Sequence, residues 1–109
     1  MGDSQLLRGI LEGCVLAIIA KGETYGYEIL SELERCGFEN ILEGTLYPVL
    51  TRLEKKASIS CRKEKSPYGP IRKYYSITES GRADLAEFQS NYQKIISAAD
   101  LILKEEGEL

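Results

Sequence analysis

The chain contains no histidine and no tryptophan, and its three cysteines, Cys14, Cys36 and Cys61, are widely spaced. Zinc sites are built from Cys and His at short intervals, so this sequence indicates neither a metal site nor another cofactor. The residue that most often serves as a general base is also missing. No P-loop, G-x-G-x-x-G or G-x-S-x-G motif occurs either. The sequence therefore offers no residues from which to build an enzyme active site.

Long apolar runs are missing as well. The longest uninterrupted stretch, residues 14–20, is far shorter than the roughly 18 residues that a membrane span needs. The first residues lack the basic region that leads into a signal-peptide core. We therefore expect a cytoplasmic protein with no membrane partner, whose cysteines are free thiols in a reducing compartment. A chain of 109 residues has room for one modest core.

The net charge is −3, but the charges are distributed unevenly. Residues 45–75 hold eight Lys or Arg against two acidic residues, whereas the rest of the chain holds six basic and fifteen acidic residues. A phosphate backbone responds to the field within about 10 Å rather than to the total charge. The central part of the chain is therefore a candidate for nucleic-acid binding, with a solvated basic surface as the alternative.

Two helices are expected before this basic region. Apolar residues recur at steps of three and four over residues 6–19, which predicts a broadly apolar helix with Ser4 as its N-cap. A second helix should start at Thr24, as its cap, and end at the Cys36-Gly37 pair. Gly26 in its first turn indicates either a close backbone approach or a tolerated imperfection that costs about 1 kcal/mol against Ala.

The stretch EGTLYPVLTRLEKK, residues 43–56, predicts a third helix. Its apolar residues gather on one side, which must face the core: Leu46, Val49, Leu50 and Leu53. The other side carries Tyr47, Pro48, Thr51 and Lys55, with Arg52 at its margin. Proline is acceptable in a first turn, where N–H groups have no partner inside the helix. The polar side chains suit phosphate oxygens and base edges, although an ordinary capped surface helix would also fit.

Two strands follow, SISCRKE at 58–64 and IRKYYSI at 71–77, joined by the turn sequence KSPYGP. The hairpin carries four cations at its tip and flanks: Lys63, Lys65, Arg72 and Lys73. Cys61 is expected to face the core beside Ile59, and a thiol open to oxidation is the alternative. Three helices and a basic two-stranded wing form the element order of a winged helix-turn-helix domain, a mainly α fold with a small β-hairpin.

The last segment begins at Thr78, a favourable N-cap, and continues as a helix with a heptad seam. The seam consists of Leu85, Phe88, Tyr92, Ile95, Ala99 and Ile102. It could pack on the first helix of its own chain, but the two apolar faces together favour a homodimer, to which Leu7, Ile10 and Leu11 would contribute. We therefore expect a DNA-binding domain over residues 1–77 and a C-terminal dimerisation helix over residues 78–109.

Four segments of the chain resemble the PadR-like transcriptional regulators: TYGYEIL at 24–30, EGTLYPVLTRLEKK at 43–56, RKYYSITESG at 72–81, and the long closing helix. The single helix after the wing is similar to the family's smaller subgroup. In the family pattern a glycine usually follows the recognition helix, which corresponds to residues 43–56 here. This chain has Ala57 at that position. The resemblance implies a bacterial winged-helix homodimer that binds a palindromic operator, usually as a repressor.

The resemblance also implies which residues meet the DNA. Thr45, Tyr47, Pro48 and Arg52 would lie at the DNA, Tyr25 and Tyr27 would approach the backbone, and the wing cations would touch flanking phosphates or the minor groove. Some relatives bind flat aromatic or hydrophobic drugs, or phenolic acids, between their subunits. Such an effector would here lie near Phe88, Asn91 and Tyr92, although no Trp is present to stack on a planar ligand.

A sequence-specific DNA-binding regulator is the main functional hypothesis that follows. It needs double-stranded DNA and a second copy of the chain as partners, with a small aromatic or hydrophobic effector as an optional third. The alternative is a protein-interaction module that reuses the winged helix, with its basic surface directed at an acidic partner.

Overall fold

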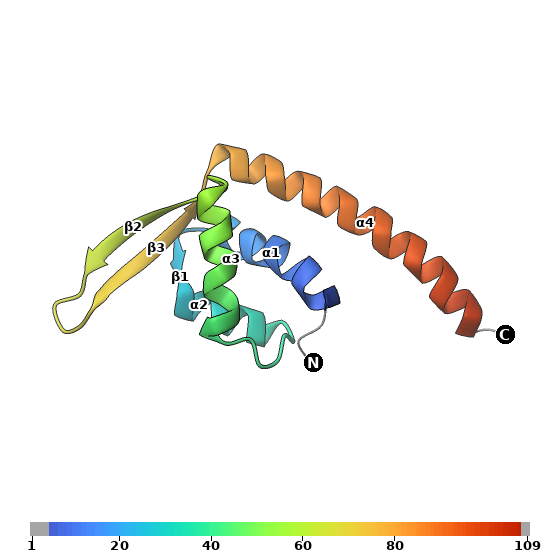
Figure 1. Cartoon of the computed structure of the whole chain (residues 1–109), viewed down its shortest axis with the longest axis horizontal. Coiled ribbons are helices and arrows are strands. Elements are labelled where there is room, and N and C mark those ends of the chain that lie inside the picture. The colour runs from blue at the N-terminus through green and yellow to red at the C-terminus, as the bar shows by residue number, and fades with distance from the viewer. Residues whose placement is uncertain (1–4, 108–109) are drawn as a thin grey trace.

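The computed structural model describes residues 5–107, so the expected cap Ser4 lies outside the described part. Its elements, in chain order, are α1 (Gln5–Ala20), β1 (Thr24–Tyr25), α2 (Gly26–Arg35), α3 (Glu43–Lys55), β2 (Ile59–Lys65), β3 (Ile71–Ile77) and α4 (Glu79–Gly107). Figure 1 shows α1, α2 and α3 gathered at the centre, with the β2–β3 hairpin and α4 extending from opposite sides. This arrangement is the winged helix-turn-helix that the sequence predicts, with a long C-terminal helix.

A third strand, β1, is not anticipated from the sequence. The sheet has the order β1-β3-β2, and Thr24 and Tyr25 pair antiparallel with Tyr75 and Tyr74. The expected role of Thr24 as the cap of α2 is therefore wrong. Tyr25 holds the N-cap position without a side-chain hydrogen bond, and the Thr24 hydroxyl donates to Glu28 at 2.9 Å. Two residues are too few to show strand periodicity, so only pairing with the distant β3 reveals this edge strand.

The hydrophobic core lies where the three central helices meet the base of the sheet. Its fully buried members include the four residues expected on the inner side of the third helix: Leu46, Val49, Leu50 and Leu53. Ile59 and Tyr75 anchor the hairpin in this core, and burial raises the pKa of Tyr75 to about 12. Cys61 is half-buried on the same side, and burial raises the pKa of its thiol, as the core-facing interpretation expects.

Pro48 does not lie in the first turn of α3, so the expectation for this residue is wrong. The helix begins at Glu43, which places Pro48 in its interior. Proline has no N–H, so the helical hydrogen bond to the carbonyl of Gly44 is not made. The helix begins where the stretch 43–56 begins, so five helical residues precede Pro48 and place it beyond the first turn.

Helices α2 and α3 end in the same way, although only one of them has the glycine that this ending favours. After α2, Gly37 adopts a φ of 108°, and Phe38 N–H donates to Leu33 O at 2.9 Å. After α3, Ala57 adopts a φ of 59°, and Ser58 N–H donates to Leu53 O at 2.9 Å. This bond pattern is the Schellman motif, whose left-handed residue is usually glycine. Ala57 therefore keeps the turn geometry at a conformational cost.

Helix α4 starts at the hairpin base and runs outward as an arm. Thr78 caps it as expected, because its hydroxyl accepts the Gly81 N–H at 2.9 Å. Near its start the arm packs against α1, where a side chain at Gly13 would overlap the ring of Phe88. Beyond this contact the helix extends away from the other elements, and the longest axis of the whole protein, arm included, measures 62 Å.

We predict that Ala57→Gly stabilises the protein by about 0.5–1 kcal/mol, because glycine adopts the left-handed conformation without the Cβ penalty. Urea unfolding followed by circular dichroism would measure the change. The matched control is Ala83→Gly on the exposed surface of α4, which should destabilise by about 1 kcal/mol. Equal destabilisation by both substitutions would show that Ala57 is not strained.

Candidate nucleic-acid interface

Helix α3 presents a continuous exposed surface opposite its buried side. It carries the residues that the sequence assigns to DNA on this helix: Thr45, Tyr47, Pro48, Thr51, Arg52 and Lys55. The Thr51 hydroxyl donates to the Tyr47 carbonyl at 3.0 Å, which leaves its oxygen free to accept a further hydrogen bond. The aromatic ring of Tyr47 is about half-exposed. The surface thus combines hydroxyl, aromatic and ammonium groups on one helix.

Gly26 allows Tyr47 to lie against the start of α2. A Cβ at Gly26 would lie 3.0 Å from the Tyr47 hydroxyl oxygen, closer than an ordinary contact. Of the two explanations for this glycine, the structure therefore supports the close approach. Tyr27 follows Gly26 and is 71% exposed, so α2 and α3 together bring two tyrosines to the same end of the molecule.

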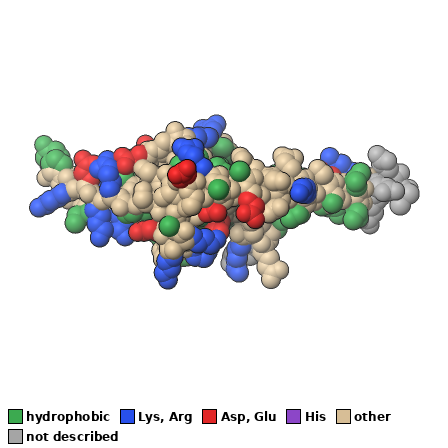
Figure 2. All heavy atoms as spheres, turned by 90° about the horizontal axis from the view of Figure 1, so that it is seen from above, with side chains coloured by type: hydrophobic (Ala, Val, Ile, Leu, Met, Phe, Trp, Pro, Cys, Tyr) green, Lys and Arg blue, Asp and Glu red, His purple; other side chains and the backbone are tan. Residues whose placement is uncertain are grey.

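The two faces of the wing have different chemistry. Successive strand residues point to opposite faces, so Lys63 and Lys73 share the face of the buried Ile59 and Tyr75. Lys63 and Lys73 are direct cross-strand partners. Among the side chains described, 5–104, neither lysine takes part in an ion pair. Figure 2 shows several Lys and Arg side chains gathered at the wing end of the molecule, its left side in that view.

The opposite face of the wing holds arginines over aromatic rings. The Arg72 guanidinium lies 4.2 Å from the centre of the Tyr25 ring. Tyr25 in turn packs edge-on against Tyr74, with ring centres 5.6 Å apart. Two of the residues that the resemblance assigns to DNA, Tyr25 and Arg72, thus contact each other on the face away from the lysine pair.

A groove separates the wing from the starts of α2 and α3. Its volume is about 520 Å³, and its lining includes Tyr27, Tyr47 and Lys73. The wing tip adds two apolar side chains that sequence reasoning did not single out, Tyr68 at 98% exposure and Ile71 at 61%. The signal for Tyr68 is present in the sequence, because it lies in the turn segment KSPYGP, where no core packing is expected.

Acidic residues neutralise part of the basic region, and two of them, Glu12 and Glu23, lie outside it in the sequence. Glu12 on α1 forms ion pairs with Arg52 at 3.2 Å and with Lys56 at 3.0 Å. Arg62 is likewise paired, with Glu23 and Glu64. Arg52, which the sequence assigns to DNA, therefore has an internal partner. The cations without a carboxylate partner among the described side chains lie on the exposed side of α3, on the lysine face of the wing and, in the case of Arg72, on the opposite face.

The residues expected at a dimer interface fall into two groups. Leu7 and Leu11 are buried within their own chain, so their side chains offer a partner no surface. Phe88 packs against α1, as the intrachain alternative expects for this part of the seam. Further along α4 the seam is open: Ile95 is 66% exposed and Ile102 is 69% exposed. Two other exposed apolar residues of the arm, Leu101 and Leu103, are not anticipated from the sequence.

An apolar cavity of about 530 Å³ lies between α1 and α4. Its lining includes Ile10, Cys14, Phe38, Phe88 and Tyr92, and the last two rings stack with centres 6.0 Å apart. The residues proposed to contact an effector therefore lie together, with Asn91 in a neighbouring cavity beside Tyr92.

Two other kinds of site do not occur in the described part of the chain. No group of three His, Cys, Asp or Glu side chains gathers there to bind a metal ion. None of the helices over residues 5–107 is both long and apolar enough to cross a membrane.

Comparison with known proteins gives a consistent result. A family model, the transcriptional regulator PadR-like family, matches residues 15–87. A PadR-like transcriptional regulator from Bacillus cereus is 41% identical, with 92% of this chain and 97% of that chain covered and a TM-score of 0.80. A Streptococcus transcriptional regulator is 40% identical, with 92% and 98% covered and a TM-score of 0.79. An uncharacterized protein of Lysinibacillus sphaericus is 36% identical, with 95% of this chain and 97% of the relative covered.

The ion pairs of Glu12 lead to a pH-dependent prediction. Partial burial acts to raise the pKa of Glu12, but hydrogen bonds from Lys56 and Arg52 outweigh it and hold the pKa below its usual 4.5. The stabilisation is therefore complete above pH 4.5 and is lost as the pH falls through the lower folded-state pKa. We expect Glu12→Gln to destabilise the protein at pH 7 and to have a smaller effect at pH 3.

Urea midpoints of the wild type and of Glu12→Gln at both pH values would measure this difference. Glu39→Gln, on the exposed connector between α2 and α3, is the control and should change neither midpoint. A difference between wild type and Glu12→Gln that persists undiminished at pH 3 would contradict the assignment to Glu12 ionisation.

Proposed function

This chain belongs to the transcriptional regulator PadR-like family, and from that membership we propose that it is a homodimeric repressor that binds a palindromic DNA operator. Members of the family are transcriptional regulators rather than enzymes. The remaining steps concern how this particular chain would recognise DNA, form a dimer and respond to an effector.

The cross-strand pair of Lys63 and Lys73 is the observation that best supports DNA as the ligand. Like charges directly opposite each other in a sheet are destabilising. Arg52, Lys56 and Arg62 have carboxylate partners, whereas these two lysines, like Lys55, Lys65 and Arg72, have none among the described side chains. A phosphate between the lysines would relieve their repulsion and release counterions.

Base readout is assigned to α3 in this proposal. A helix fits the major groove of B-DNA, and phosphate contacts from a wing set its position without reading sequence. Thr45, Tyr47 and Thr51 are exposed along the helix and would reach base edges or the nearest phosphates. Lys63, Lys65 and Lys73 would supply most of the non-specific affinity from the wing.

Dimerisation is assigned to α4. We infer that residues 1–77 form the DNA-binding domain and residues 78–109 the dimerisation arm. The outer part of the seam is open, because Ile95 and Ile102 are each about two-thirds exposed within the described chain. A two-fold partner would bury this apolar stripe and place two copies of α3 at successive major grooves, about 34 Å apart.

The cavity between α1 and α4 is the proposed effector site. Phe88 and Tyr92 supply aromatic surface, and Asn91 beside them supplies a polar group for a phenolic or hydrophobic ligand. A ligand there would contact the helix that carries the dimer seam. Its binding would change the separation of the two α3 helices and thereby release the operator.

Fluorescence anisotropy on DNA from upstream of the protein's own gene, beside a shuffled duplex, would test the proposal at two salt concentrations. We expect tighter binding to the native DNA, with one dimer per site. Lys73→Gln should weaken binding to both duplexes alike and flatten the dependence of log K on log salt by about 0.9 for each phosphate that the variant no longer neutralises. Lys94→Gln on α4 is the matched control and should leave both the affinity and its salt dependence unchanged.

Two outcomes would contradict the proposal. Equal and steeply salt-dependent binding to both duplexes would show that the protein binds DNA without sequence specificity. No binding at low salt would instead favour a protein-interaction module whose lysine face meets an acidic partner.

The dimer is tested separately by Ile102→Asp. A charge at this exposed seam position should yield monomers without loss of helix content, because the side chain contributes nothing to the core of its own chain. Size-exclusion chromatography with light scattering measures the mass. Ser97→Asp, on the other side of α4, should leave a dimer. A dimer mass for Ile102→Asp would exclude this seam.

A further inference from the structure

We propose that Glu23 is a positioning residue that holds the wing at its working angle to α3 through Arg62. This inference rests on the proposed function, because the wing angle matters only when wing and α3 bind the same DNA. Glu23 lies in the turn between α1 and β1, and Arg62 lies on β2, so one ion pair joins the helical body to the far strand of the wing.

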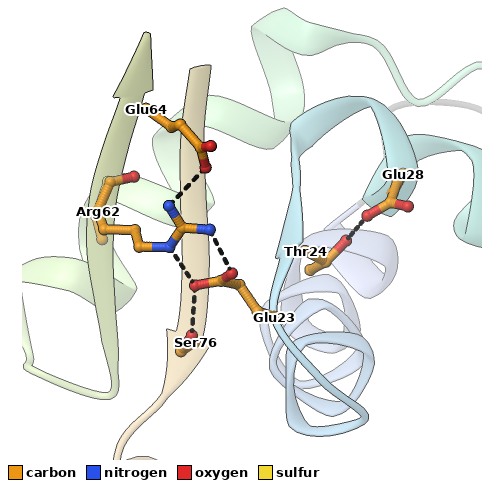
Figure 3. A network of polar contacts seen from close by, with 7 residues as sticks. Glu23, Thr24, Glu28, Arg62, Glu64 and Ser76 are labelled. Carbon is orange, nitrogen blue, oxygen red and sulfur yellow. Dashed lines mark hydrogen bonds and ion pairs between the residues drawn. The ribbon is translucent and has the colours of Figure 1, made fainter. Parts of the chain in front are cut away.

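The pair has a geometry that fixes orientation. Arg62 Nε donates to Glu23 Oε2 at 2.8 Å, and Arg62 Nη2 donates to Glu23 Oε1 at 2.8 Å. Figure 3 shows this two-pronged contact, with Glu64 accepting a third bond from Nη1 at 2.7 Å and Ser76 donating to Glu23 at 3.4 Å. A bidentate arginine–carboxylate pair restricts both distance and angle. With three of its N–H groups engaged, Arg62 is committed to the protein rather than to phosphate.

Aromatic rings extend the same contact across the sheet. The Arg62 guanidinium lies 4.6 Å from the centre of the Tyr74 ring, on the neighbouring strand β3. Tyr74 packs edge-on against Tyr25 of β1, and the Arg72 guanidinium also lies over the Tyr25 ring. The series Arg62, Tyr74, Tyr25 therefore runs from the edge strand β2 across β3 to the edge strand β1, and Arg72 leads back to β3.

The wing needs such a contact because the core does not reach its outer part. Ile59 and Tyr75 are its buried side chains, and both lie at the base. Residues 62–73 are exposed apart from the half-buried Ser66 at the turn. Exposed ion pairs add little to global stability. They can still set the orientation of a segment that opens more easily than the core.

The proposal predicts that loss of the Glu23 carboxylate changes DNA affinity in the direction opposite to that expected from long-range charge alone. Removing a carboxylate beside a DNA-binding surface strengthens binding when only long-range charge matters. If Glu23 positions the wing, Glu23→Gln weakens operator binding even though the protein becomes less negative. We expect about a fivefold loss of affinity. Glu39→Gln removes the same charge from the connector before α3 and should not weaken binding.

Amide hydrogen exchange on the free protein provides a readout that does not depend on DNA. In Glu23→Gln the amides of residues 62–73 should exchange about fivefold faster, while those of buried Leu33 and Leu50 keep their rates. In an Arg62→Met background the same change at Glu23 should have no further effect, because its partner is already gone. A shorter duplex that keeps the contacts to α3 and lacks those to the wing should bind wild type and Glu23→Gln equally.

The inference is overturned if Glu23→Gln binds the operator as tightly as wild type or tighter, or if wing exchange is unchanged. It is also overturned if the Glu23 and Arg62 effects on exchange are additive. Failure of the proposed function is distinguishable from these results: wild type would then show no preference for the operator, and the exchange data alone would decide whether Glu23 orders the wing.

Discussion

The alternation of side chains along β3 connects the hydrophobic core, the lysine face of the wing and its aromatic face. Tyr75 and Ile77 point into the core, Lys73 lies on the same side further out, and Arg72 and Tyr74 point to the opposite face. Because β3 is the central strand, one edge pairs with β1 from the helical body and the other with β2 of the wing. A shift of one residue in this register would exchange the two faces, placing lysines on the aromatic side and Tyr75 in solvent.

The acidic residues complete the sorting of charge that β3 begins. An excess of carboxylates over the whole chain is compatible with a basic surface because specific acids are committed to specific cations. Glu12 holds Arg52 and Lys56 at the α1–α3 contact, and Glu23 holds Arg62 on the aromatic side of the wing. The wing lysines are left without such partners among the described residues. One of these lysines, Lys73, lines the groove beside α3.

Close contacts at two glycines determine where the longer elements lie. Because Gly26 has no side chain, the Tyr47 hydroxyl can lie against α2. This contact positions the aromatic residue of α3, the helix proposed to read the DNA bases. Gly13 admits the Phe88 ring, which directs the start of α4 along α1 and leaves the rest of the arm open. A side chain at either position would displace an aromatic ring rather than remove a bond. The proposed DNA-binding and dimer surfaces therefore both depend on packing inside the body.

The sequence alone determined the winged-helix order, the inner side of α3, the two wing strands, the cap at Thr78 and the family. These features depend on periodicity and local turn chemistry, which neighbouring residues report. It did not reveal β1, the interior position of Pro48, the left-handed Ala57, or the burial of Leu7 and Leu11 within their own chain. Nor could it show that Arg52 and Arg62 are held by Glu12 and Glu23, some forty residues away along the chain. Those outcomes depend on which distant surfaces meet, and only the tertiary structure decides that.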